Sequence, residues 1–339
     1  FGAHPLLSYA VVGLGAAAYS PAKYGILTEL LPHERLVAAN GWIEGLTVLS
    51  IIMGTVLGGV LIMPATTEFF MSIPFAGLSS HVDTPAEVAI FVIMFGYILA
   101  AGFNLRIPLT GAQYDPQLNH PIRMTQRFFR NVVELWQDKL GQISLAVTTL
   151  FWGAGATLQF IVLKWAESAL GMTLDKGAIL QGVCAFGVAG GAIVAARMIP
   201  LKKSMRVLPV GIAMGAVTMG MVLVQDLVTA FILIVIIGAF SGFFVVPMNA
   251  LLQHRGHVLM SAGRSIAIQN FNENFSVLSM LGIYALLISF DVHVNTVILI
   301  FGLFVMLTMM LVILRHRYTE NRYQVERHIG EDKPIGVSH

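Results

Sequence analysis

The sequence predicts an all-α protein that crosses a membrane many times. Of its 339 residues, 56% are hydrophobic and only 11% are charged, whereas a soluble domain carries about 25% charged residues. The mean hydropathy of +0.78 has the same implication. The chain also holds 33 glycines, and glycine lets transmembrane helices approach one another closely. We therefore expect a polytopic α-helical membrane protein.

Nine apolar runs are long enough to cross a bilayer as a helix, which takes about 20 residues. The longest polar segment, residues 108–141, separates the third run from the fourth. The nine runs cover residues 6–30, 38–63, 87–107, 142–170, 177–197, 206–225, 227–252, 262–290 and 292–314.

The second half of the polar segment predicts an amphipathic helix. Apolar residues recur at helical spacing, at Phe128, Val132, Leu135 and Trp136, and basic residues lie opposite them. A helix of this kind is typical of the membrane surface, with its apolar face in the boundary between headgroups and acyl chains.

The positions of the basic residues predict the topology. Seventeen of the 20 lysines and arginines lie in alternate loops or in the C-terminal tail, and the opposite loops hold only Lys176. The positive-inside rule therefore predicts a cytoplasmic C-terminus. Nine helices then leave Phe1 outside, and the simplest explanation is that an odd number of helices precedes it.

A short internal repeat links two helix pairs that lie six runs apart. Glu44–Ser50 (EGLTVLS) recurs as Glu273–Ser279 (ENFSVLS), and Tyr19–Lys23 (YSPAK) aligns with Val245–Asn249 (VVPMN). Both copies have the same predicted orientation, as expected for parallel repeats related by an axis along the membrane normal. Two halves of six helices require twelve, so we expect three helices before Phe1.

The predicted organisation has four parts, with the nine visible helices numbered 4 to 12 of twelve. Residues 1–107 are the last three helices of an N-terminal bundle, 108–141 a cytoplasmic linker, 142–315 a C-terminal six-helix bundle and 316–339 a cytoplasmic tail.

This arrangement resembles the major facilitator superfamily and, within it, the bacterial lysophospholipid transporters. The resemblance covers nearly the whole chain and is densest in four blocks. They are VGLGAAAYSPAKYGILTEL (12–30), TLFWGAGATLQF (149–160), SGFFVVPMNALLQHRG (241–256) and SIAIQNFNEN (265–274). The chain departs from the family in lacking the first-helix acidic residue, and in having Gln159 where some relatives have arginine.

The resemblance implies movement of lysophospholipids, chiefly lysophosphatidylethanolamine, from the outer to the inner leaflet of a bacterial inner membrane. It also implies a functional partner, a lysophospholipid acyltransferase on the cytoplasmic side. The other expected contacts are with membrane lipid; the basic residues form no patch for nucleic acid.

Lys23 and Glu44 are ionisable residues inside predicted membrane helices, where such residues are functional-site candidates by default. Lys23 lies roughly 9 Å from the midplane at 1.5 Å per residue, with Tyr19 on the same helix face. The resemblance implies that Lys23 binds the lipid phosphate or pairs with the absent carboxylate. The alternative is a lysine that extends to the inner headgroups. Glu44, at a similar depth, either pairs with a cation or is protonated; a purely structural buried pair remains open.

Glu273, the repeat counterpart of Glu44, lies in the most polar membrane stretch. At least one face of this stretch must meet a cavity or a partner helix, so it predicts a pore lining, with helix–helix hydrogen bonding as the alternative. The candidates in this stretch are Gln269, Asn270 and Glu273.

Three further polar or charged positions lie in the predicted membrane helices. Asn249, the counterpart of Lys23, is neutral, so the cation is predicted in one half only. Gln159, with Trp152 one heptad earlier, is a candidate headgroup contact. Lys164 with Glu167 predicts an ion pair at the membrane interface.

Two glycine runs, at Gly54–Gly59 and Gly187–Gly191, have the spacing of closely packed membrane helices. His254 and His257 share a loop with too few partners for a metal site. No cofactor is expected, and without a G-x4-G-K-[ST] motif direct use of ATP is unsupported.

The leading hypothesis is therefore a lysophospholipid transporter working by alternating access. The second is a proton-coupled transporter of a soluble drug or sugar, with Glu44 or Glu273 as proton carrier. An acyltransferase enzyme is disfavoured, because none of the ten histidines is followed by aspartate in the H-x4-D spacing that such enzymes use as a general base.

Overall fold

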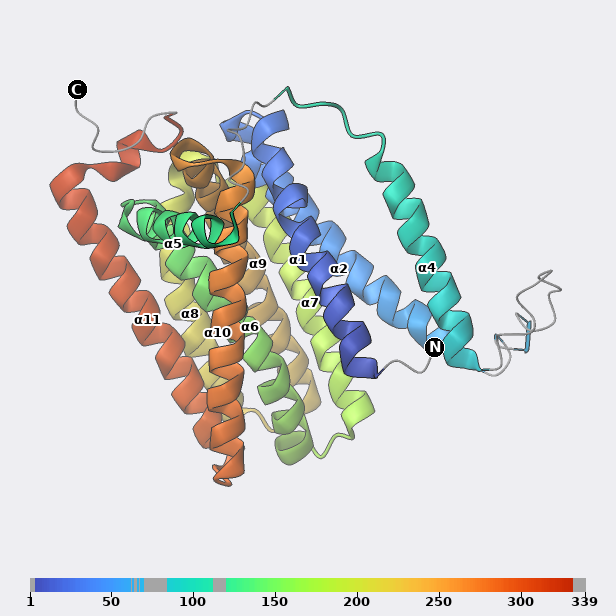
Figure 1. Ribbon diagram of the computed structural model, residues 1–339. Helices are drawn as coiled ribbons and strands as arrows, with labels where there is room; N and C mark the ends of the chain where they lie inside the picture. The colour runs from blue at the N-terminus through green and yellow to red at the C-terminus, as the bar shows by residue number, and fades with distance from the viewer. Residues whose placement is uncertain are drawn as a thin grey trace, which may run out of the picture. The chain divides into compact units, whose positions relative to one another are not determined.

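The computed structural model describes residues 4–61, 63, 66, 68–69, 84–111 and 120–331, and all regular structure in these ranges is helical. Figure 1 shows the helices along the chain. The α-helices are α1 (Pro5–Leu30), α2 (Leu36–Leu61), α4 (Pro85–Asn104), α5 (Pro121–Gln137), α6 (Gly141–Leu170), α7 (Leu174–Met198), α8 (Leu208–Met219), α9 (Leu227–Leu259), α10 (Ala262–Ser289) and α11 (Val294–Tyr323). Short 3-10 turns lie at His33–Arg35, Leu201–Val207, Gly220–Leu223 and Val325–His328.

The predicted fold class is confirmed. Each of the nine apolar runs coincides with one long helix, the sixth being α8 extended by 3-10 turns at both ends. Six helices of the described chain are long and apolar enough to cross a membrane, from Gly141–Leu170 to Val294–Tyr323. The polar stretch between α4 and α6 holds the predicted amphipathic helix, which is α5.

Local sequence signals set several helix ends. Before α4, Thr84 and Glu87 form a capping box, in which each side chain accepts a hydrogen bond from the backbone N–H of the other. Asp226 caps α9 by accepting a 2.9 Å hydrogen bond from the Thr229 backbone N–H, which lowers the pKa of its carboxyl. α6 ends at Gly171, whose φ of 60° suits glycine.

The described residues form two compact units. One contains those up to Leu46 and those from His120 to Glu331, and the other lies between Thr47 and Gly111. The larger unit includes α1, the start of α2 and all helices from α5 to α11, so it contains every predicted site residue.

Glycine brings α7 and α9 together in the larger unit. A Cβ atom on Gly187 or Gly191 would overlap backbone atoms of α9, and one on Gly238 or Gly242 would overlap backbone atoms of α7. This agrees with the packing predicted for the second glycine run. In the first run, a Cβ on Gly54 or Gly58 would meet no described atom within 4 Å, so packing is not seen there.

Helix α5 lies across the long helices rather than along them (Figure 1). Phe128, Val132 and Leu135 pack against Leu145 of α6, Leu252 of α9 and Ile268 of α10. Three of the four residues of the predicted apolar face of α5 therefore contact the long helices, and the fourth, Trp136, is 39% exposed.

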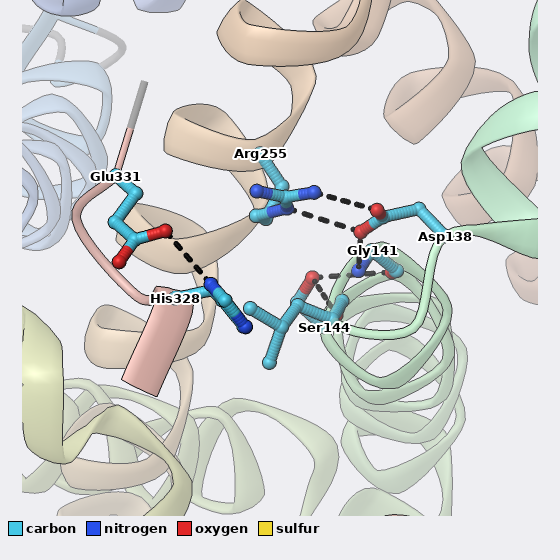
Figure 2. A network of polar contacts seen from close by, with 7 residues as sticks. Asp138, Gly141, Ser144, Arg255, His328 and Glu331 are labelled. Atoms are coloured by element: carbon cyan, nitrogen blue, oxygen red, sulfur yellow. Dashed lines mark hydrogen bonds and ion pairs between the residues drawn. The ribbon is translucent and has the colours of Figure 1, made fainter. Parts of the chain in front are cut away.

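Two buried polar pairs tie the larger unit together at the ends of α2, α5 and α9. The Arg255 guanidinium donates to Asp138, with Nη2–Oδ1 2.6 Å and Nε–Oδ2 3.1 Å (Figure 2). Asp138 Oδ2 also accepts from the Gly141 backbone N–H at 2.8 Å, which fixes the start of α6. Asn40 and Gln253 exchange two amide hydrogen bonds of 2.8 and 2.9 Å.

Candidate functional site

A polar cavity of about 260 Å³ lies among α1, α2, α6, α9 and α10 in the larger unit. Its wall combines carboxylates, amides and hydroxyls with a few apolar groups. It is lined by Ser20, Tyr24, Glu44, Trp152, Asn249, Gln253, Ile266, Gln269, Asn270, Glu273, Asn274 and Val277. Six of the nine predicted site residues are therefore brought together here.

A chain of hydrogen bonds organises the wall formed by α9 and α10. The Gln269 side chain donates to Asn249 Oδ1 at 3.0 Å and to Glu273 Oε1 at 2.7 Å. Gln269 and Glu273 are four residues apart and so lie on one face of α10. All three side chains are buried. The polar stretch of α10 thus lines a cavity and also forms hydrogen bonds to a partner helix. These are the two alternatives that the sequence left open, a pore lining and helix–helix hydrogen bonding.

The two carboxylates of the cavity, Glu44 and Glu273, are buried without a direct ion pair in the described chain, although Lys23 interacts electrostatically with Glu44. No ion pair to Glu44 or Glu273 is found in the part of the chain that the structure describes, and Glu44 Oε1 is buried without a hydrogen bond. The carboxylates lie close enough to interact electrostatically with each other. Burying anions without compensation is costly, so this cavity is suited to a cationic group or to protons.

Lys23 and Tyr19 do not line the cavity. Lys23 is half-buried, with its Nζ 4.9 Å from the centre of the Tyr24 ring, and Tyr19 is 50% exposed. The cavity-facing residues of α1 are instead their sequence neighbours, Ser20 and Tyr24. One position along a helix is a rotation of about 100°, which separates the two faces. Lys23 still lies close enough to Glu44 to interact with it electrostatically.

Ser20 and Tyr24 carried a signal that sequence reasoning missed. They are four residues apart and therefore share a helix face, as Tyr19 and Lys23 do. Ser20 Oγ accepts a hydrogen bond of 2.9 Å from Asn270 Nδ2, which joins α1 to α10. The charge of Lys23 was the reason for selecting Tyr19 and Lys23, and these two residues lie on the neighbouring face of α1.

On α6, Trp152 lines the cavity and Gln159 does not. Seven residues advance a helix by about 10 Å, so Gln159 lies two turns away along the same side. Its backbone carbonyl accepts a 3.3 Å hydrogen bond from Gln181 of α7. Nearer the end of α6, Lys164 pairs with Glu167 at 2.9 Å on an exposed surface, as predicted.

Gln253 and Asn274 are further lining residues that were not predicted. Gln253 is one turn after Asn249 in α9, and its amide pairs with Asn40 as well as bordering the cavity. Asn274 ends the polar stretch of α10 and donates to the Asn270 carbonyl at 2.7 Å. Among the described residues, no group of three His, Cys, Asp or Glu side chains could hold a metal ion.

Comparisons with a family model and with individual proteins both find similarity to membrane transporters. The sequence pattern described as "Major Facilitator Superfamily" matches residues 5–276. "Lysophospholipid transporter LplT" of Pectobacterium carotovorum subsp. carotovorum is 40% identical over 294 residues, which is 86% of this chain and 67% of that protein. The protein of the same name from Yersinia enterocolitica is 41% identical over 87% of this chain and 68% of its own length.

A solved structure shares the fold. The crystal structure of a bacterial homologue of the iron transporter ferroportin, in an outward-facing state, superimposes with a TM-score of 0.61 at 13% sequence identity. The superposition covers 93% of this chain and 72% of that one.

Proposed function

Because this chain belongs to the major facilitator superfamily, in its family of bacterial lysophospholipid transporters, we propose that it carries lysophospholipids across a membrane by alternating access. The observation that carries the proposal is the pair of buried carboxylates, Glu44 and Glu273, which face a cavity and form no ion pair with any described residue.

The chemistry of the cavity matches a zwitterionic headgroup. A primary ammonium of lysophosphatidylethanolamine offers three N–H donors, and the carboxylates of Glu44 and Glu273 accept them with charge assistance. The amide N–H groups of Asn270 and Asn274 supply donors to the phosphate. Lys23, beyond Tyr24 at the margin of the cavity, supplies positive charge as the lipid enters or leaves. The resemblance implied a phosphate contact at Lys23, and this proposal adds the amides of Asn270 and Asn274 to it.

The physical need for such a cavity is clear. A single acyl chain is stable in lipid, but a charged headgroup cannot cross hydrocarbon unaided. Trp152, Ile266 and Val277 make part of the wall apolar, which accommodates the start of the acyl chain beside the headgroup. Transport then requires the polar cavity to open to each side in turn.

Two features support the direction and location that we propose for transport: the distribution of charge, and the similarity to bacterial lysophospholipid transporters. The basic loops and tail favour a cytoplasmic C-terminus in a bacterial inner membrane. We propose inward movement, from outer to inner leaflet, where an acyltransferase of the cytoplasmic side would restore the second chain. In this proposal residues 1–107 and 142–315 belong to the two rocking bundles, with 108–141 as linker and 316–339 as tail.

The test is inward movement of labelled lysophosphatidylethanolamine in proteoliposomes that contain the full-length protein. Glu273→Gln and Glu44→Gln remove one charge each, and we expect each to lower the initial rate at least ~10-fold, since a charge-assisted hydrogen bond contributes about 1.5–3 kcal/mol. Glu167→Gln, which removes a carboxylate at the exposed end of α6, is the matched control and should retain the rate. Absence of protein-dependent movement would overturn the proposal.

A second candidate, a proton-coupled transporter of a soluble drug or sugar, is supported by the same buried carboxylates. Glu44 or Glu273 would then take up a proton on one side of the membrane and release it on the other. Uptake of a soluble solute that requires an imposed proton gradient, with no movement of lysophosphatidylethanolamine, would favour this function.

A further inference from the structure

A second cavity, separate from the first, lies between α5 and the beginning of α10. Its volume is about 240 Å³. It is lined by Met124, Arg127, Phe128, Asn131, Arg264, Ala267 and Ile268. None of these residues borders the cavity proposed for transport, which lies on the side of α10 that carries Gln269 and Glu273.

The lining of this cavity combines cationic and polar side chains with apolar ones. Arg127 comes from α5 and Arg264 from the first turn of α10, and both side chains are half-buried. Asn131 adds a buried amide, and the lining includes no carboxylate. Two guanidinium groups converging from two helices favour an anion with several oxygens, because each can donate two hydrogen bonds to it.

An exposed apolar stripe on α5 indicates what surrounds this cavity. Ile122, Phe129, Val133 and Trp136 are 63%, 52%, 52% and 39% exposed. Their spacings of seven, four and three residues place them on one helix face. This face differs from that of Phe128 and Leu135, which pack against the long helices. Contacts of Phe128 and Phe129 with Phe271, and a 3.2 Å hydrogen bond from Trp136 Nε1 to Asn272 Oδ1, hold α5 on α10.

We propose that this cavity binds the phosphate of an anionic two-chain phospholipid of the surrounding bilayer. Arg127 and Arg264 bind the phosphate oxygens. On another side of α5, the stripe of Ile122, Phe129, Val133 and Trp136 enters the boundary between headgroups and acyl chains. A surface helix with an apolar stripe and adjacent arginines has the chemistry that recognises anionic lipid. The occupant is therefore a lipid rather than a soluble phosphate, since the exposed stripe places α5 and its cavity at the level of the lipid headgroups.

The test measures thermal unfolding of the purified full-length protein in a neutral detergent while lipid is added. The probes are dioleoylphosphatidylglycerol, dioleoylphosphatidylcholine as the neutral lipid, and glycerol 3-phosphate as the soluble headgroup. We expect the unfolding temperature to rise with the concentration of phosphatidylglycerol and not with the other two probes, because a ligand that binds only the folded state stabilises it.

Variants of the two arginines locate the site. Arg127→Gln combined with Arg264→Gln should weaken phosphatidylglycerol binding by ~20-fold or more, at about fivefold for each arginine near an anionic lipid surface. The matched control is Arg123→Gln with Arg130→Gln, which removes two exposed arginines from the same helix outside the cavity and should change binding less than ~3-fold. If the double variant does not fold, Arg127→Gln alone, on a surface helix, should still lose about fivefold.

Three outcomes would overturn the proposal. One is equal stabilisation by phosphatidylcholine, which would indicate acyl-chain binding without headgroup recognition. Another is equal stabilisation by glycerol 3-phosphate, which would identify a site for soluble anions. The third is an equal loss of binding in the Arg123/Arg130 control. All three are independent of transport, because Glu273→Gln should bind phosphatidylglycerol as the parent protein does.

Discussion

The larger unit has two buried polar regions, and they differ in how their charges are balanced. At the end of α9, Arg255 and Asp138 are joined by two hydrogen bonds, and Asp138 also receives the Gly141 N–H. Nearer the middle of the unit, Glu44 and Glu273 face a cavity, with no ion pair to either among the described residues. Both regions bury carboxylates, but among the described residues of the two regions only Asp138 is paired directly with a cation.

Gln253 of α9 lies between the two regions in the sequence and takes part in both kinds of environment. Its amide forms two hydrogen bonds with Asn40, yet it also borders the cavity. Buried polar groups that satisfy one another hold a fold in one arrangement. Buried carboxylates left without a partner cost stability, and a protein retains them where a ligand or a proton completes the site. The first region therefore stabilises the fold, and the second is the candidate binding site.

The largest predicted effect is at the balanced ion pair. Arg255→Met leaves Asp138 as an uncompensated buried anion, and we expect a loss of about 3–5 kcal/mol in unfolding free energy. Thermal or denaturant unfolding in detergent micelles measures it. Arg255→Met combined with Asp138→Leu removes both charges and should recover most of the loss; no recovery would mean that the pair matters for some reason other than charge balance.

A smaller effect is predicted at the amide pair. Asn40→Leu leaves the buried Gln253 side chain with lost hydrogen bonds, which costs about 1–3 kcal/mol. The double variant Asn40→Leu with Gln253→Met should be closer to the parent protein in the same unfolding measurement. Equal destabilisation by the single and double variants would argue against coupling of the two amides.

The smallest effect on stability is predicted at the cavity. Glu44→Gln removes a buried charge that has no ion-pair partner, so unfolding free energy should change by less than about 0.5 kcal/mol or increase. The same variant should lose transport. A loss of stability as large as that of Arg255→Met would erase the contrast between the two regions and identify Glu44 as structural.

Much of the fold follows from local sequence. Nine apolar runs predicted nine long helices, and the amphipathic segment predicted α5. The aligned prolines of the internal repeat, Pro21 and Pro247, both lie inside helices, α1 and α9. Glu44, Glu273, Gln269, Asn270 and Asn249 could be selected as site residues because polar groups at membrane depth are costly, and that cost depends on residue type and position alone.

The faces of the helices were harder to predict. Tyr19 and Lys23 and their neighbours Ser20 and Tyr24 have the same spacing, so periodicity in α1 supports both faces equally. Packing against α10 determines which face lines the cavity, because Asn270 of α10 donates a hydrogen bond to Ser20. The apolar side of α5 was ambiguous in the same way, because one stripe packs on the long helices and another is exposed.

The sequence by itself therefore determined the helices of the described chain and their number. It also identified the polar and charged residues that are too costly to face lipid. Only the tertiary structure decided which of those residues meet. Asn40 and Gln253 are 213 positions apart, and Asp138 and Arg255 are 117 apart. Helix formation depends on hydrogen bonds within four residues and on the surrounding lipid. A cavity instead depends on the relative rotation of helices, which is set by packing between distant segments, as at the glycines of α7 and α9.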